Sequence, residues 1–184
     1  LLQLLVEMLG EEILMRLGDV VYGFDNDTLE GVLVRQLVEQ NKTIAVAESC
    51  TGGYIANVLT NIPGVSQVFK EGFVTYSNEA KIKSLGVSKA TLDKWGAVSR
   101  QTAFEMADGL LRKTGVDIGI AVTGIAGPGG ATPDKPIGLV YIGVGSKDDI
   151  DVKKYNFNGD RLRIKQSTAK AALDMARRQL NSPY

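Results

Sequence analysis

The stretch TIAVAESCTGGYIANVL, residues 43–59, decides the fold. Its first part, residues 43–49, is a short run of apolar and small side chains that is typical of a buried strand. The paired glycines Gly52 and Gly53 follow, and the apolar residues beyond them recur at helical spacing. A strand, a tight turn and a helix in direct succession predict a layered α/β domain.

The segments on either side continue this alternation. The last two expected strands are separated by only a few residues, which predicts a hairpin. We therefore expect a three-layer α/β/α sandwich whose sheet is mostly parallel and carries an antiparallel edge hairpin. The expected helices are 28–41, 50–64, 78–86, 101–115 and 161–180, and the expected strands are 43–49, 69–77, 116–124, 138–146 and 151–158.

The composition excludes several classes of protein. Lys plus Arg and Asp plus Glu number 21 each, so no bulk basic charge favours a nucleic acid or an anionic membrane as partner. The chain has no histidine, which removes Ser-His-Asp and Cys-His catalysis and every histidine-ligated metal site. A single cysteine, Cys50, forbids an internal disulfide and a thiolate zinc site. We expect a cytoplasmic protein without metal or cofactor.

The N-terminal segment, residues 1–23, differs from the rest of the chain. Residues 1–17 are strongly apolar but contain three glutamates, and no stretch reaches the roughly 20 uninterrupted apolar residues that span a bilayer. An amphipathic helix that packs on this domain or on a partner is expected. The chain begins with Leu1 and not with Met, which we interpret as the sign of a processed or excised piece of a longer protein.

Three loops follow expected strand ends and should meet at one edge of the sheet: residues 48–53, 75–78 and 123–130. Ser49 lies at the sharp turn between strand and helix, where glycines let backbone N–H groups approach a ligand. Two interpretations stay open here. Ser49 can act as a nucleophile, or Ser49 and Thr51 can simply cap the helix.

A serine nucleophile needs a base, and without histidine the candidates are a neutral lysine, a tyrosinate or a carboxylate. Lys81, one turn into the helix that begins at Asn78, can fold back toward Tyr76 at the strand end. Desolvation readily lowers the pKa of a lysine, so a Ser-Lys or Ser-Tyr-Lys relay is chemically sound. The alternative is a solvated Lys81 near Glu79. Glu48 is a second-choice base, favoured as an orienting group.

The glycine-rich loop after the third strand suits close approach to an anion or to a developing oxyanion. It is not a P-loop, because Gly130 and Ala131 stand where Lys and Ser/Thr are required. We expect N–H groups near Gly52 and Gly53, helped by Thr123, to hold the oxyanion. The candidate substrate-binding residues are Thr51, Gly52, Gly53, Asn78, Gly124, Gly127, Gly129 and Gly130.

Other conspicuous residues receive simpler interpretations. Cys50 is a possible rival nucleophile, but without histidine to hold its thiolate it is interpreted as a small buried residue. The basic residues Arg161, Arg163 and Lys165 are interpreted as a solvated helix face. Trp95 is interpreted as a packing residue.

Four motifs carry a family resemblance. They are AESCTGG at 47–53, EGFVTYSNEAKIKSLGV at 71–87, GAVS at 96–99 and AVTGIAGPGGATPDKPIG at 121–138. In this order and at this spacing they resemble the C-terminal domain of the competence/damage-inducible protein CinA, the family that includes the nicotinamide-nucleotide amidases (PncC). The resemblance extends from about residue 28 to residue 180.

The resemblance implies an amidohydrolase that converts the carboxamide of nicotinamide mononucleotide to the acid and ammonia, in pyridine-nucleotide recycling. It implies Ser49 as the nucleophile, Tyr76 and Lys81 as its activating groups, and Thr123 at the reacting centre. The expected partner is a small-molecule nucleotide substrate, and self-association into a homo-oligomer is expected.

The resemblance also implies a division of the chain. Longer family members carry a molybdopterin-binding-like domain upstream, so residues 1–23 are expected to be its tail or linker and residues 24–184 the amidohydrolase domain. The competing hypothesis is a non-catalytic nucleotide-binding or regulatory module of a two-domain protein. A metal-dependent phosphohydrolase is disfavoured, because the sequence offers no compact acidic cluster.

Overall fold

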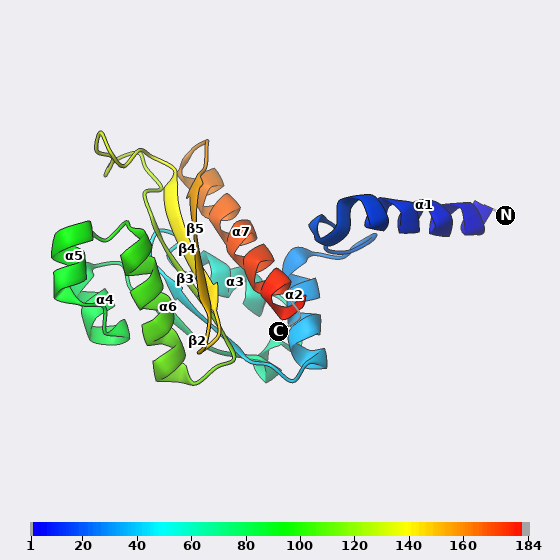
Figure 1. Cartoon of the computed structure of the whole chain (residues 1–184), viewed down its shortest axis with the longest axis horizontal. Helices are drawn as coiled ribbons and strands as arrows, with labels where there is room; N and C mark the ends of the chain where they lie inside the picture. The colour runs from blue at the N-terminus through cyan, green and yellow to red at the C-terminus, as the bar shows by residue number, and fades with distance from the viewer. Residues whose placement is uncertain (1, 182–184) are drawn as a thin grey trace.

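A five-stranded sheet with the strand order β2-β1-β3-β4-β5 forms the middle layer of the structure (Figure 1). The computed structural model of the chain describes residues 2–181. The strands are β1 (Ile44–Glu48), β2 (Phe69–Val74), β3 (Ile118–Gly124), β4 (Leu139–Gly145) and β5 (Ile150–Asn156). The helices are α1 (Leu2–Leu17), η1 (Gly18–Val20), α2 (Leu29–Glu39), α3 (Tyr54–Thr60), η2 (Val65–Gln67), α4 (Asn78–Leu85), α5 (Lys89–Trp95), α6 (Arg100–Thr114) and α7 (Arg161–Asn181).

The strand directions bring four carboxyl ends to one edge of the sheet. Strand β1 pairs in parallel with β2 and with β3, whereas β4 runs antiparallel to both β3 and β5. Strands β1, β2, β3 and β5 therefore point the same way, and β4 alone points back. The α/β sandwich and the hairpin of the last two strands are confirmed.

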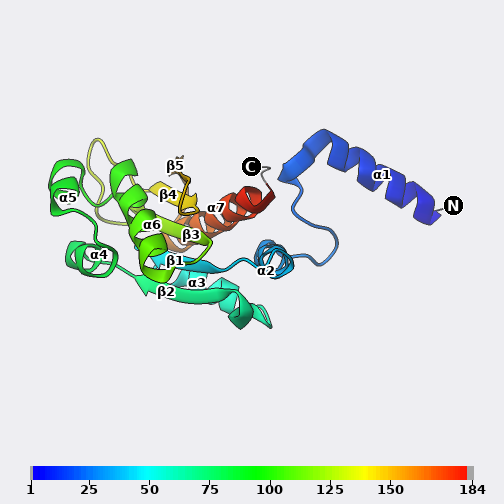
Figure 2. The same ribbon diagram turned by 60° about the horizontal axis from the view of Figure 1, so that its bottom comes forward.

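Helices cover both faces of the sheet (Figures 1 and 2). Helices α2, α3 and α7 lie on one face, and α4, α5 and α6 lie on the other. The side chains of β1 alternate between two apolar clusters: Ile44 and Val46 belong to the α7 side, Ala45 and Ala47 to the α6 side. By this alternation Ser49 lies on the α6 side, directly after the strand.

Side-chain hydroxyls cap three helices. Thr28 caps α2, Ser77 caps α4 and Ser99 caps α6, each accepting a hydrogen bond from a backbone amide three residues later. Helix α5, in contrast, was not among the expected helices. It is short and buries only Leu92, and its start is held by Glu105 of α6, a tertiary contact that a local pattern does not reveal.

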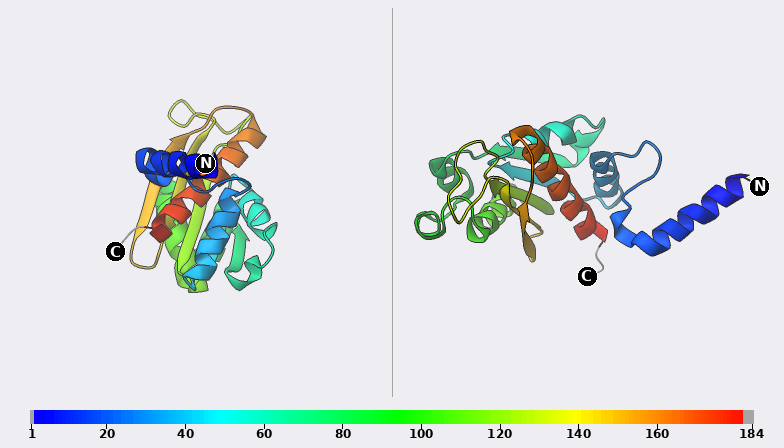
Figure 3. Two further views of the ribbon diagram at one scale, coloured as in Figure 1. Left: turned by 90° about the vertical axis from the view of Figure 1, so that its right-hand side faces the viewer. Right: turned by 90° about the horizontal axis from the view of Figure 1, so that it is seen from above.

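Helix α1 projects away from the sandwich (Figures 1 and 3). It forms as a helix, as predicted, but the large apolar side chains of residues 5–17 are exposed and do not pack on the domain. Its exposed large apolar residues are Leu5, Val6, Met8, Leu9, Ile13, Leu14, Met15 and Leu17. Packing of this helix on a partner stays a prediction. Within residues 2–181, no helix combines the length and apolar character needed to cross a membrane.

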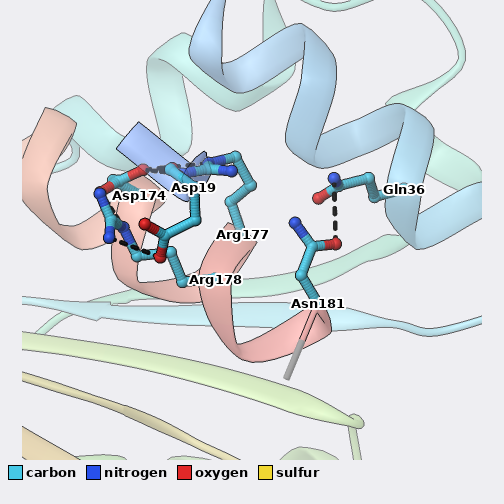
Figure 4. A network of polar contacts seen from close by, with 6 residues as sticks. All are labelled: Asp19, Gln36, Asp174, Arg177, Arg178 and Asn181. Atoms are coloured by element: carbon cyan, nitrogen blue, oxygen red, sulfur yellow. Dashed lines mark hydrogen bonds and ion pairs between the residues drawn. The ribbon is translucent and has the colours of Figure 1, made fainter. Parts of the chain in front are cut away.

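The turn that follows α1 is tied to the C-terminal half of α7 (Figure 4). Arg177 is buried and donates hydrogen bonds to the carbonyl oxygen of Asp19 and to the carboxylate of Asp174. Arg178 bridges the same two residues through their carboxylates, at 2.7 Å each. Two neighbouring arginines thus join η1 to the sandwich.

Candidate active site

Ser49 occupies a sharp turn at the carboxyl end of β1. Its amide donates to the carbonyl oxygen of Val122 at 3.0 Å, which continues the ladder between β1 and β3 by one residue. Gly52 and Gly53 then adopt positive φ angles of 61° and 92°, a region that side chains other than glycine rarely enter. The glycine pair therefore allows α3 to start immediately, and Ser49 keeps 8% of its surface exposed.

Glu48 holds the start of α3. Its buried carboxylate accepts hydrogen bonds from the amides of Gly53 at 3.0 Å, Ile55 at 3.1 Å and Ala56 at 2.8 Å. The N-cap residue of α3 is Gly53, which forms no side-chain cap. The alternative in which Ser49 and Thr51 cap this helix is therefore wrong. The contacts of Glu48 are those of an orienting group.

The expected oxyanion donors have internal partners in this structure. The amide of Gly52 donates to the carbonyl oxygen of Ser49 at 3.1 Å, and the amide of Gly53 is bound by Glu48. Thr123 is fully buried and its hydroxyl donates to the carbonyl oxygen of Ala97 at 2.7 Å. All three groups already donate their protons to acceptors within the chain. The expectation that they hold the oxyanion therefore needs correction.

Lys81 lies in direct contact with Ser49. It is 1% exposed, although it belongs to a short surface helix, and its Nζ lies 3.0 Å from Ser49 Oγ. The same Nζ lies 2.8 Å from the carbonyl oxygen of Thr75 and 3.5 Å from that of Tyr76. The alternative of a solvated Lys81 is therefore wrong. The predicted meeting of hydroxyl and amine is present.

The surroundings of Lys81 favour the neutral amine. Burial is the main cause that lowers the pKa of Lys81 below its usual value of 10.5, and the nearby Cys50 opposes this to a smaller extent. Within residues 2–181, no ion pair joins a carboxylate to Lys81. A neutral amine has two N–H donors and one lone pair. In that form, with its two N–H groups on the two carbonyls, Lys81 can accept the Ser49 proton on its lone pair.

Cys50 points away from this chemistry. It belongs to the apolar cluster on the α7 side of the sheet. Burial raises the pKa of its thiol to about 12, so the thiolate required of a nucleophile is not formed near neutral pH. The interpretation of Cys50 as a small buried residue is confirmed.

Tyr76 presents its main chain, and not its phenol, to Lys81. The side chain is 60% exposed and its hydroxyl accepts a hydrogen bond from Arg161 at 2.8 Å. The other terminal nitrogen of the Arg161 guanidinium donates to the carbonyl oxygen of Gly127 at 2.6 Å. Arg161 therefore ties the β2 loop to the glycine-rich loop at the rim of the site.

The basic residues at the start of α7 are more than a solvated face. Besides the contacts of Arg161, a Cβ placed on Gly52 would lie 3.8 Å from Lys165 Nζ, so this amine borders the Ser49 turn. Sequence reasoning missed both residues. The predicted hairpin could have revealed them. Because β5 runs in the same direction as β3, the helix after β5 begins at the edge of the sheet where Ser49 lies.

The remaining candidate residues fall into three groups. Gly124 and Gly127 are packing glycines, because a Cβ on either would lie under 3 Å from Val140 or Ile137. Gly129, Gly130 and Asn78 are exposed, Asn78 as the first residue of α4. Thr51 is fully buried and its hydroxyl has no partner. In residues 2–181 no group of three His, Cys, Asp or Glu side chains is placed to hold a metal ion.

The fold and this site define a class: an α/β sandwich in which a strand-end serine meets a buried lysine from the next crossover helix. The family model described as the CinA C-terminal domain matches residues 26–180. The chain belongs to the CinA C-terminal domain family, and the family resemblance is confirmed.

Relatives and solved structures agree with this assignment. A protein of Caldicellulosiruptor saccharolyticus, named as competence-damage inducible, is 52% identical over 176 residues, covering 96% of this chain and 43% of that protein. A CinA-like protein of Kosmotoga olearia is 48% identical over 176 residues, with the same coverage of 96% and 43%. This chain thus spans less than half the length of these relatives.

Among solved structures, the competence/damage-inducible protein CihA of Agrobacterium tumefaciens aligns with a TM-score of 0.79 and 39% identity, covering 87% of this chain and 100% of that chain. A CinA superfamily protein of Klebsiella pneumoniae aligns with a TM-score of 0.81 and 32% identity, covering 83% and 96%.

Proposed function

We propose that this domain is an amidohydrolase that removes ammonia from the carboxamide of nicotinamide mononucleotide through a serine nucleophile. The contact of 3.0 Å between Lys81 Nζ and Ser49 Oγ carries the proposal. It supplies a nucleophile and a base within hydrogen-bond reach in a chain that has no histidine. The family membership of the chain supports the substrate class, since the family includes nicotinamide-nucleotide amidases.

The first half of the reaction forms an acyl-enzyme. The Ser49 proton passes to the lone pair of Lys81, and Oγ forms a bond to the carboxamide carbon while the carbonyl electron pair moves to oxygen. When this tetrahedral intermediate collapses, the carbon–nitrogen bond breaks. The ammonium of Lys81 gives its proton to the departing nitrogen, and ammonia leaves.

The second half returns the enzyme to its starting state. A water molecule loses a proton to Lys81 and attacks the ester carbon, the bond to Oγ breaks, and the proton returns to Ser49. The products are nicotinic acid mononucleotide and one ammonia. No step in this scheme requires a metal.

Basic groups at the rim suit an anionic substrate. Lys165 borders the Ser49 turn, and Arg161 joins Tyr76 to Gly127 at the rim, so two basic side chains are available to an anionic group. The amides at the start of α3 are occupied by Glu48, so this helix end is not the phosphate site. We assign the phosphate of the nucleotide to the basic rim.

The deciding experiment measures ammonia release from nicotinamide mononucleotide with a coupled assay. The wild-type chain should release one ammonia per acid formed, and Ser49→Ala should reduce release to the uncatalysed rate without loss of folding. Turnover that survives in Ser49→Ala rejects the nucleophile. Nucleotide binding without ammonia release by the wild type would favour the non-catalytic nucleotide-binding module instead.

A further inference from the structure

Thr75, the residue after β2, carries a buried hydroxyl that has no hydrogen-bond partner. The residue is 2% exposed, and its main chain is fully used: the amide donates to Glu48 and the carbonyl accepts from Lys81. An unpaired buried hydroxyl costs stability, and a valine would fill the same volume without that cost. Buried groups of this kind are rare enough in folded proteins to call for a cause.

The register places this hydroxyl beside the reacting pair. Glu48 of β1 pairs with Val74 of β2, so the next residues along, Ser49 and Thr75, are neighbours across the parallel ladder. The alternation of side chains supports the same placement, because Phe73 of β2 packs in the apolar cluster on the α6 side. Thr75 and Ser49 each follow a member of that cluster by two residues. Both hydroxyls therefore lie on the face that Lys81 covers.

The hydrogen-bond capacity of Lys81 changes during the reaction. In the neutral amine that the proposed function requires, the carbonyls of Thr75 and Tyr76 accept the two N–H groups, and the lone pair can accept from Ser49 Oγ, which lies 3.0 Å from Nζ. After proton transfer the ammonium has a third N–H. The Ser49 oxygen has by then bonded to the substrate carbon and is a weak acceptor. The third N–H therefore needs another acceptor until the leaving nitrogen takes the proton.

We propose that Thr75 is a positioning residue whose hydroxyl accepts this third N–H and so stabilises the protonated Lys81. The inference rests on the proposed function, because it requires Lys81 to act as the base. The hydroxyl belongs to the residue whose carbonyl already holds Nζ at 2.8 Å, so the proposal requires the protonated amine to shift toward the side chain of the same residue. A hydroxyl that is unpaired in the resting enzyme and hydrogen-bonded in the intermediate lowers the stability of the fold but stabilises the intermediate relative to the resting state.

The test uses a fluorophosphonate probe, so that its result does not depend on the natural substrate. The probe phosphonylates an activated serine: the bond from Oγ to phosphorus forms, fluoride leaves, and Lys81 takes the proton. Intact-protein mass spectrometry gives the rate of labelling, and peptide mapping locates the label. The full chain is compared with Thr75→Val, which keeps the shape, and Thr75→Ser, which keeps the hydroxyl.

The expected result separates the hydroxyl from the methyl group. Thr75→Val should label at Ser49 at least about tenfold more slowly, the effect of one lost hydrogen bond to a charged group, with an unchanged or higher Tm. Thr75→Ser should stay within about threefold of wild type, which a packing role of the γ-methyl group does not predict. Thr168→Val is the matched control, because Thr168 is equally buried but bonds only within α7.

Three results overturn the inference. Equal labelling rates in wild type and Thr75→Val remove the role of Thr75 and leave the serine nucleophile standing. A wild-type protein that is not labelled at Ser49 removes both proposals together. If Thr75→Val melts below wild type, Thr75→Ser is compared with Thr75→Ala, since both lack the γ-methyl, and equal rates in that pair also overturn the inference.

Discussion

The carboxylate of Glu48 accepts a hydrogen bond of 2.8 Å from the amide of Ala56, and this contact joins the end of β1 to the first turn of α3. Two further amides of the same turn bond to the carboxylate. The negative charge lies at the positive end of the helix, where it is favoured. Ser49 lies between the end of β1 and the first turn of α3, which Glu48 holds together. Glu48 therefore sets the position of the nucleophile without contacting the reacting atoms.

Replacing Glu48 with glutamine should weaken both folding and catalysis. The amide group keeps the size of the side chain but offers one acceptor oxygen in place of two, so at least one buried backbone amide loses its partner. We expect a loss of about 1–3 kcal/mol in the free energy of unfolding, measured with urea. Ammonia release should fall as well, because the Ser49 turn is no longer held.

Asp117→Asn provides the control for Glu48→Gln. Asp117 accepts from the amide and hydroxyl of Thr43 at the opposite end of the parallel strands, so its loss should destabilise the fold by a similar mechanism. The kcat of this variant should stay at the wild-type value. If Glu48→Gln is destabilised and still keeps its full kcat, the turn does not depend on Glu48.

Replacing Lys81 with methionine should raise stability while it abolishes activity. Burial lowers the pKa of Lys81 in the folded protein, so the unfolded chain binds this proton more tightly. The wild type therefore gains stability as the pH rises from that lowered pKa to the ordinary value of 10.5. At pH 7 the methionine variant lacks this penalty and should melt higher, by what burial of the charge costs less what the Thr75 carbonyl loses with its donor.

Calorimetric scans at several pH values check this prediction. The advantage of Lys81→Met should shrink as the pH approaches 10.5, because the unfolded wild-type lysine then also loses its proton. Lys89→Met is the control, since Lys89 is exposed and pairs only with Asp93. A constant difference between Lys81→Met and wild type up to pH 10.5 would show that Lys81 is not perturbed by burial.

The pH dependence of kcat/KM follows from the same shift. Lys81 has to be neutral to accept the Ser49 proton, so activity should fall about tenfold per pH unit below its pKa. Because burial lowers this pKa, the midpoint of the acidic limb should lie below 10.5. Initial rates of ammonia release between about pH 5 and 10 test this. A flat profile would contradict a lysine base.

Some features of this site follow from the sequence and others depend on three-dimensional contacts. Parallel strands place their carboxyl ends together, so the approach of Lys81 to Ser49 was predictable from two strand–helix units. The direction of the Tyr76 side chain was not, because it follows the end of β2, where strand alternation no longer applies. The orienting role of Glu48 was expected but its partners were not, since a carboxylate that bonds to amides five to eight residues later leaves no periodic signal.

Tyr76→Phe distinguishes a rim residue from an acid or base. The phenol bonds to Arg161, and the contact of Tyr76 with Lys81 is made by the carbonyl, which phenylalanine retains. We expect kcat to fall by less than about tenfold, whereas loss of a general acid or base costs roughly 10²–10⁴-fold. A fall in that larger range would restore the phenol to the activating role that the family resemblance implies. Tyr155→Phe, on β5, controls for loss of a phenol elsewhere in the sheet.

Replacing Arg177 with methionine should loosen the turn that carries α1 and leave the active site unchanged. The carbonyl oxygen of Asp19 would lose its buried donor, whereas Asp174 would keep Arg178 (Figure 4). Hydrogen exchange at the amide of Val21, which closes η1 by bonding to Gly18, reports this directly. It should accelerate in Arg177→Met, with kcat at the wild-type value.

Arg178→Met is the matched comparison for Arg177. Arg178 is more exposed, and exposed ion pairs contribute only about 0–1 kcal/mol, so its loss should change the exchange of Val21 far less. The two variants should differ because Arg177 is buried. Its guanidinium is removed from water, and the Asp19 carbonyl and the Asp174 carboxylate accept its hydrogen bonds instead. Equal exchange of Val21 in both variants would mean that the two exposed carboxylate contacts, and not the buried donor, hold η1 on α7.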